Sequence, residues 1–241
     1  GNSSQNYFPF TTGDLAKLPY PGKAANGKLK SAGEADWHHQ RFNFDPGNVD
    51  LPVLYFFSRN PDYDHYWVIE YDVRFSGAWP DFFTANAESD ADLLGTTLTR
   101  RPDAQDWHHW PSLRLGNRRI GARNQIRGFF PIYRLSRRAL ERLDKDYRSG
   151  VGGHFECLLP TLLNDAGLTL EDIGGTGEFV RPSNVNRFYR NTPSAASLGP
   201  GTFIFRPVMA KPGREPNMLW HPVRPPLTWR AKSRQRTGTL L

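Results

Sequence analysis

Two acidic residues occupy alternate positions in a segment that is dense in β-branched and aromatic residues. The segment covers residues 66–75, and the acids are Glu70 and Asp72. Alternate side chains of a strand share one face, so both carboxylates are predicted to point the same way near the end of this strand. Mg²⁺ and Mn²⁺ prefer such oxygen ligands and often bridge them to substrate phosphates. The pair is therefore a candidate metal site, with an ordinary ion pair to Arg74 as the alternative.

Three short motifs resemble those of one enzyme class, the GT-A glycosyltransferases. Residues 67–75 resemble the D-x-D segment, in which an apolar strand ends in two acids that hold a metal and the nucleotide diphosphate. Residues 152–163 are similar to the segment in which an acid precedes a helix that lines the acceptor site. Residues 217–223 lie late in the chain, where many of these enzymes supply a histidine to the metal. The resemblance covers roughly residues 51–223, and the order of its motifs carries it.

The resemblance implies a role for four residues. Glu70, Asp72 and His221 would hold Mn²⁺ or Mg²⁺, and Glu156 would be the catalytic base. The donor would be a nucleotide sugar, and the acceptor would be a glycan or another hydroxyl compound. The first acid of the D-x-D segment is Glu70 rather than an aspartate, which leaves open whether a metal is needed. The dipole of the helix after Glu156 is expected to keep this carboxylate ionised.

Further candidates for substrate contacts are aromatic, basic or glycine residues near these motifs. The segment 107–110 contains two adjacent histidines, which would face opposite sides of an extended chain, so a sugar platform or ordinary packing is favoured over a metal site. Cys157 is interpreted as a small core residue rather than a nucleophile. Five arginines between residues 114 and 127 form either a phosphate contact or a solvated face. The candidate substrate contacts are Arg74, Trp79, Trp107, His108, His109, Trp110, Gly153 and His154.

The expected elements alternate between strands and helices. Strands are predicted over residues 66–73, 90–97, 127–133 and 202–206, with the first as a buried interior strand. Helices are predicted after the caps Asp50 and Ser136, and over residues 156–165, while residues 7–48 are expected to form a long loop. This pattern favours an α/β fold with a mostly parallel central sheet covered by helices on both faces, as in the GT-A fold. The chain opens with polar residues where that fold has its first strand, so a form without this strand is expected.

Composition limits the remaining alternatives. The chain has 241 residues, 38% hydrophobic and 23% charged, which predicts one folded domain over residues 1–228 and a basic flexible tail over residues 229–241. The single cysteine, Cys157, excludes an internal disulfide framework and fits a cytoplasmic location. No apolar run is long enough to span a membrane. The alternatives to a glycosyltransferase are a metal-dependent phosphoesterase or nuclease and a non-catalytic carbohydrate-binding module; no specific nucleic-acid motif is present.

The net charge of +7 predicts salt-sensitive attraction to polyanions, with residues 229–236 as its main source. Deleting the residues after Leu227 is expected to abolish retention on a heparin column. Retention that is unchanged at moderate salt would contradict this and indicate a folded basic surface.

Overall fold

The structure is a computed structural model, and it describes residues 8–24, 46–190 and 201–224. The expected basic tail lies outside these ranges. So do Trp37, His38 and His39, which repeat the tryptophan and paired histidines of residues 107–109 and are expected to pack within a loop. The helices are α1 (Thr12–Ala16), α2 (Pro21–Ala24), α3 (Leu51–Phe57), α4 (Trp79–Ala87), α5 (Arg137–Arg148) and α6 (Phe155–Asp165). The strands are β1 (His65–Ile69), β2 (Arg74–Phe75), β3 (Leu93–Gly95), β4 (Thr99–Arg100), β5 (Ile126–Arg127), β6 (Ile132–Ser136), β7 (Leu170–Asp172) and β8 (Leu219–Trp220).

The main sheet has four strands in the order β1-β6-β3-β7, and it is mixed. β6 pairs antiparallel with both β1 and β3, and only β3 and β7 run parallel. The expectation of a mostly parallel central sheet is therefore wrong. Two short antiparallel pairs, β2-β8 and β4-β5, complete the strand pairing.

The strand predicted to be interior, β1, lies at an edge of this sheet and ends at Ile69. Its apolar residues are explained by cover on both faces rather than by neighbours on both sides. Tyr66 packs into one hydrophobic cluster, and Trp67 packs against Phe82 and Phe83 of α4 on the opposite face. An edge strand that is covered on both faces has an apolar pattern similar to that of an interior strand. The composition of residues 66–73 therefore could not distinguish the two positions.

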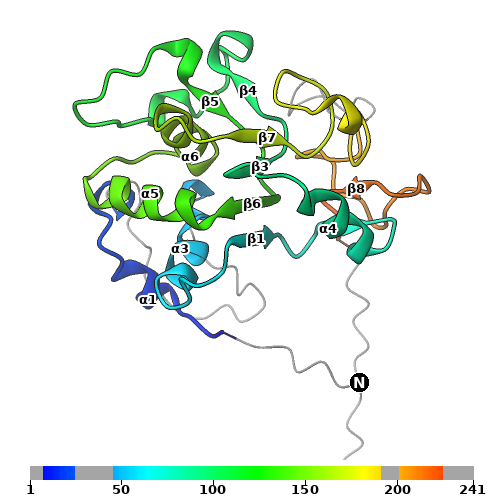
Figure 1. Cartoon of the computed structure of the whole chain (residues 1–241), viewed down its shortest axis with the longest axis horizontal. Coiled ribbons are helices and arrows are strands. Elements are labelled where there is room, and N and C mark those ends of the chain that lie inside the picture. Colours follow the sequence, from blue (N-terminus) through cyan, green and yellow to red (C-terminus); the bar gives the residue numbers. More distant parts are fainter. Residues whose placement is uncertain (1–7, 25–45, 191–200, 225–241) are drawn as a thin grey trace, which may run out of the picture.

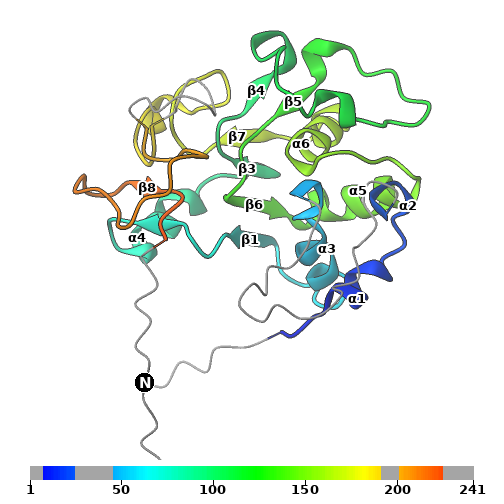
Figure 2. The same cartoon turned by 180° about the vertical axis from the view of Figure 1, so that it is seen from behind.

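The sheet has a hydrophobic cluster on each face. Leu93 and Leu135 belong to one cluster, whereas Leu94 and Ile132 belong to the other, as the period of two in a strand requires. Figure 1 shows α1, α3, α5 and α6 gathered on one side of the molecule and α4 and β8 on the other. The view from behind in Figure 2 shows the same grouping, with β8 beside α4.

The two predicted long helices are confirmed. Ser136 caps α5, since its hydroxyl accepts from the amide of Ala139 at 3.0 Å. Helix α6 starts at Phe155, and Pro160 lies inside it with its side chain buried. Two predicted strands differ: residues 127–133 are divided between β5 and β6, and residues 202–206 form only an isolated bridge, between Phe203 and His221. Part of the predicted N-terminal loop is helical, as α1 and α2.

A buried ion pair connects α2 to the rest of the molecule. Lys23 Nζ lies 3.0 Å from Asp50 Oδ1, and both side chains are only 1% exposed. The other carboxylate oxygen of Asp50 accepts from the hydroxyl of Tyr147. Asp50 stands at the start of α3, but its side chain makes no capping hydrogen bond, so its predicted role as a cap is wrong. The carboxylate neutralises Lys23 instead.

Replacing one member of this pair leaves the other charge buried and unpaired. Lys23→Met is expected to lower the free energy of unfolding by about 3–5 kcal/mol, measured by urea denaturation. Adding Asp50→Asn should recover part of that loss. Lys17→Met serves as the control, because Lys17 is 81% exposed and should change stability by no more than about 0.5 kcal/mol. Equal losses for Lys23→Met and Lys17→Met would contradict the assignment.

Candidate functional site

Glu70, Asp72 and His221 form one cluster, whose potential ligand atoms all lie within 4.8 Å of one another. His221 Nε2 is 3.4 Å from Glu70 Oε2 and 3.5 Å from Asp72 Oδ1. His221 Nδ1 lies 2.8 Å from the carbonyl oxygen of Ile204. A carbonyl oxygen can only accept, so Nδ1 carries a proton and Nε2 is the nitrogen that faces the two acids.

A turn, rather than a strand, brings the two acids together. The amide of Glu70 still donates to the carbonyl of Pro131 at 2.8 Å, but the chain then folds back, and the amide of Val73 donates to the carbonyl of Glu70 at 3.1 Å. The expected alternation along a strand is therefore wrong for these residues, although both carboxylates do approach His221. The C-terminal segment joins them through the amide of Val223, which donates to the carbonyl of Asp72 at 2.8 Å.

The charged forms of Asp72 and His221 stabilise each other. Burial raises the pKa of Asp72, but the interactions with His221 and Arg224 outweigh it and lower the pKa to about 2. Burial lowers the pKa of His221, but Asp72, Glu70 and the Ile204 carbonyl outweigh it and raise the pKa to about 9. The protein without a metal therefore holds a positive imidazolium between two carboxylates at neutral pH.

Asp72 has an incompletely satisfied carboxylate. The side chain is fully buried, and its Oδ2 accepts from Arg224 Nε at 2.7 Å. Its Oδ1 is buried and has no partner in normal hydrogen-bonding geometry, because the 3.5 Å separation from His221 Nε2 is long. The ion pair with His221 therefore compensates this buried oxygen only in part, and a bound cation would satisfy it more fully.

Glu156 lies in the first turn of α6, and its Oε1 accepts from the amide of Phe130 at 3.1 Å. Burial raises the pKa of this carboxyl to about 7; the Phe130 amide opposes the shift, and the negative charge of Glu70 adds to it. The expectation that the helix dipole would keep Glu156 ionised is wrong, because desolvation outweighs the dipole here. A carboxyl group with a pKa near neutrality can exchange a proton under physiological conditions.

Two histidines stack beside Glu156. The rings of His154 and His109 lie 3.8 Å apart at an interplanar angle of 16°. His154 caps α6 by accepting from the amide of Glu156 through Nδ1 at 3.4 Å, and burial lowers its pKa to about 3, so the ring is neutral. The hydroxyl of Ser112 accepts from the amide of His154 and donates to the carbonyl of His109, which holds the loop against the helix.

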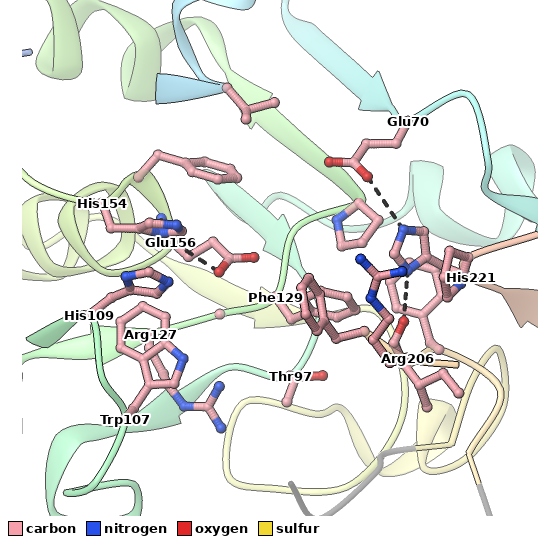
Figure 3. Close-up of a pocket in the computed structure, with 18 of the residues that line it drawn as sticks. Glu70, Thr97, Trp107, His109, Arg127, Phe129, His154, Glu156, Arg206 and His221 are labelled. Atoms are coloured by element: carbon pink, nitrogen blue, oxygen red, sulfur yellow. Dashed lines mark hydrogen bonds and ion pairs between the residues drawn. The ribbon is translucent and has the colours of Figure 1, made fainter. Parts of the chain in front are cut away.

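A cavity of about 460 Å³ connects Glu70 and His221 of the cluster with Glu156 and the two histidines, whereas Asp72 is buried behind its wall. Figure 3 shows Glu70, His221 and Arg206 on one side, and Glu156, His154, His109, Trp107 and Arg127 on the other. Phe129 lies between the two sides, with its ring 5.4 Å from that of His221. A cavity of this volume, with aromatic walls and ionisable groups that converge on it, is typical of a ligand site.

Half of the predicted substrate contacts line this cavity: Trp107, His108, His109 and His154. The other half do not. Arg74 donates to the carbonyls of Tyr71 and Val73, and Trp79 packs against Phe75 and Phe82. Trp110 is buried with its indole N–H on Ala104, and Gly153 forms the turn before α6 with a φ of +144°.

The structure bears on two further predictions, the geometry of residues 107–110 and the role of Cys157. Residues 107–110 form a turn rather than an extended segment, so the rings of His108 and His109 lie together, 3.9 Å apart. Within the described residues they belong to no metal-binding cluster. Burial raises the pKa of the Cys157 thiol to about 12, which agrees with its interpretation as an inert core residue.

Sequence reasoning missed several residues of the cavity: Thr97, Phe129 and Arg206. Thr97 has a positive φ of 55°, which is rare for a β-branched residue, and its amide donates to the hydroxyl of Tyr189 at 2.7 Å. No signal in the sequence points to this conformation. Arg127 belongs to the predicted arginine run, and of the five arginines it alone lines the cavity.

Comparison with family models, with curated proteins and with solved structures gives no match to this chain. Among the residues that the structure describes, no helix has the length and apolarity to cross a membrane.

The raised pKa of Glu156 makes stability depend on pH. The ordinary value is 4.5 and the value in the fold is about 7, so the folded state favours the protonated carboxyl. Its contribution is present below about pH 4.5 and is lost as the pH rises through about 7. Glu156→Gln imitates the protonated form, and its unfolding free energy relative to wild type should rise by about 1.4 kcal/mol per pH unit between these limits.

Urea denaturation at several pH values measures this difference. Glu88→Gln is the control, since Glu88 is exposed at the end of α4 and outside the cavity. A Glu156→Gln difference that stays constant from pH 5 to pH 8 would show that this carboxyl is ionised throughout.

Proposed function

We propose that this chain is a divalent-cation-dependent glycosyltransferase, which moves a sugar from a nucleotide-diphosphate donor to a hydroxyl acceptor. The observation that carries the proposal is the pairing of two unlike groups across one cavity. A carboxylate–imidazole cluster lies on one side, and a carboxyl group with a pKa of about 7 lies on the other. The chemistry of these two groups supports the proposed reaction, whereas the mixed sheet gives no support from the GT-A fold.

The residues of the cluster fit Mn²⁺ or Mg²⁺. Two carboxylate oxygens and an imidazole nitrogen are suitable ligands, Mn²⁺ being the more tolerant of imidazole. Asp72 Oδ1 is a buried oxygen without a hydrogen-bond partner. The bond from His221 Nδ1 to the Ile204 carbonyl is the kind of support that orients a metal-binding histidine. Once His221 Nε2 has released its proton, Glu70, Asp72 and His221 would hold the cation, which would neutralise charge on the departing diphosphate.

Basic residues on the same side favour an anionic donor. Arg206 lines the cavity near the cluster and has no acidic partner among the described residues. Arg224 also lines it, with its Nε on Asp72. Guanidinium groups bind phosphate oxygens through paired N–H donors, so both are suited to a diphosphate.

Glu156 would act as the base on the acceptor. Its Oε1 is held by the Phe130 amide, which leaves Oε2 to receive a proton. In the proposed step the acceptor oxygen forms a bond to the anomeric carbon, and the bond from that carbon to the diphosphate oxygen breaks. The hydroxyl proton moves to Glu156 and the electron pair leaves with the diphosphate. A base with a pKa near the working pH is effective in such a transfer.

The walls of the cavity suit a sugar ring. Trp107 and His109 present aromatic surface on the side of Glu156, and Phe129 presents it between the two sides. Aromatic faces pack against the apolar C–H surface of a sugar, while the polar ends of the cavity orient its hydroxyls. A cytoplasmic location is proposed for the reaction, and the free, buried Cys157 is compatible with that compartment.

Two variants should distinguish donor binding from turnover: Asp72→Asn is expected to lose donor binding, and Glu156→Gln is expected to lose turnover alone. Nucleoside diphosphates are expected to raise the unfolding temperature of the wild type only when Mn²⁺ is present, since a ligand of the folded state stabilises it. Asp72→Asn should lose this shift, and Glu70→Gln tests the same cluster at a residue that is 34% exposed. Glu156→Gln should keep the shift, and its turnover of nucleotide sugar should fall by about 10²–10⁴-fold.

Glu88→Gln is again the control and should behave as wild type. Release of inorganic phosphate from nucleoside diphosphates would contradict transfer and indicate a phosphoesterase. A shift with free sugars and none with any nucleoside diphosphate plus Mn²⁺ would indicate a carbohydrate-binding module.

A further inference from the structure

Arg127 has an unpartnered guanidinium group in the wall of the cavity. The residue ends β5, is half-buried, and lines the cavity beside Trp107. Its Nε is buried and has no hydrogen-bond partner. Within residues 8–24, 46–190 and 201–224, its side chain makes no hydrogen bond and no ion pair. The other internal arginine of the predicted run, Arg118, is bound to Asp146.

The surroundings of Arg127 offer it only partial compensation. Its guanidinium lies 5.5 Å from the centre of the Trp107 ring, a cation–π contact that uses none of its N–H donors for a hydrogen bond. Burial lowers the pKa of Arg127, and the charge of Glu156 opposes this shift. The two side chains nevertheless make no ion pair. The buried Nε is left without a hydrogen-bond partner at the wall of the cavity, so the geometry favours an anion supplied by the ligand.

The position of Arg127 assigns this anion to one side of the cavity. Figure 3 shows Arg127 and Trp107 on the side of Glu156 and His109, across from Glu70 and His221. The backbone keeps it there, because the amide of the next residue, Gly128, donates to the carbonyl of Glu156 at 2.8 Å. The donor diphosphate has its own charge partners on the far side, at the cation cluster and Arg206.

We propose that Arg127 binds an anionic group of the acceptor, so that the acceptor is a sugar carrying a carboxylate or a phosphate. This inference rests on the proposed function, since it uses Glu156 as the base that faces the acceptor hydroxyl. The sugar ring packs on Trp107, the anion binds the free edge of Arg127, and a hydroxyl lies toward Glu156. A guanidinium matches either anion with two parallel N–H donors, which an ammonium group does not.

Binding of simple sugars tests the inference without knowledge of the natural acceptor. The probes are glucuronic acid and glucose 6-phosphate, with glucose as the neutral comparison, measured by titration calorimetry or ligand-observed NMR without metal. Both anionic sugars should bind the wild type at least about tenfold more tightly than glucose. The stronger of the two identifies the carboxylate or the phosphate as the preferred group.

Arg127→Met should remove the preference for anionic sugars, and Arg127→Lys should restore it only in part. Arg123→Met is the matched control, because Arg123 is four residues away, exposed and outside the cavity. The binding of nucleoside diphosphate with Mn²⁺ should be the same in all three variants. Unfolding midpoints establish that each variant is folded, and Arg127→Lys carries the test if Arg127→Met does not fold.

Two results would overturn the inference. The first is equal binding of glucose and the anionic sugars to the wild type. The second is loss of nucleoside diphosphate binding in Arg127→Met, which would assign Arg127 to the donor. Preferential, Arg127-dependent binding of an anionic sugar by a protein that binds no nucleoside diphosphate would support the anion site and refute the transfer reaction.

Discussion

The structure of the site depends on the burial of one carboxylate, that of Asp72. Without exposed surface it needs positive partners, and these come from His221 and Arg224, about 150 residues later in the chain. The same contact brings the C-terminal segment across the end of β1, where the amide of Val223 bonds to the Asp72 carbonyl. Phe203 and Ile204 then reach the cavity beside His221. The walls on this side therefore exist because Asp72 is neutralised there.

The two sides of the cavity differ in how they treat charge. On the side of Asp72, the buried carboxylate is paired with the cations of His221 and Arg224, and this is the side to which the proposed metal and diphosphate would bind. On the side of Glu156, burial dominates, and the carboxyl and the imidazole of His154 both favour their neutral forms. One fold thus provides a charged surface and a proton-exchanging surface a short distance apart, and group transfer to a hydroxyl requires both.

The second side is built by a helix start held from two directions. Lys23 donates to the carbonyl of Gly153 and pairs with Asp50 behind the helix. In front of it, Ser112 connects His154 to the aromatic loop, and the amides of Gly128 and Phe130 bond to Glu156. The buried ion pair therefore contributes to the position of the proposed base as well as to stability.

The sequence alone determined the local features of this protein. The hydroxyl of Ser136 and the apolar spacing behind it specify α5, and the acids and histidine that form the cluster are visible as chemically suitable residues. Tertiary structure decided which of them meet. Apolar content could not distinguish an edge strand covered on both faces from an interior one, so β1 and the parallel sheet were mispredicted. The turn at residues 70–73, the raised pKa of Glu156 and the unpaired guanidinium of Arg127 also escaped prediction. These three features depend on burial by segments that are distant in the chain. The residues next to them in sequence do not determine that burial.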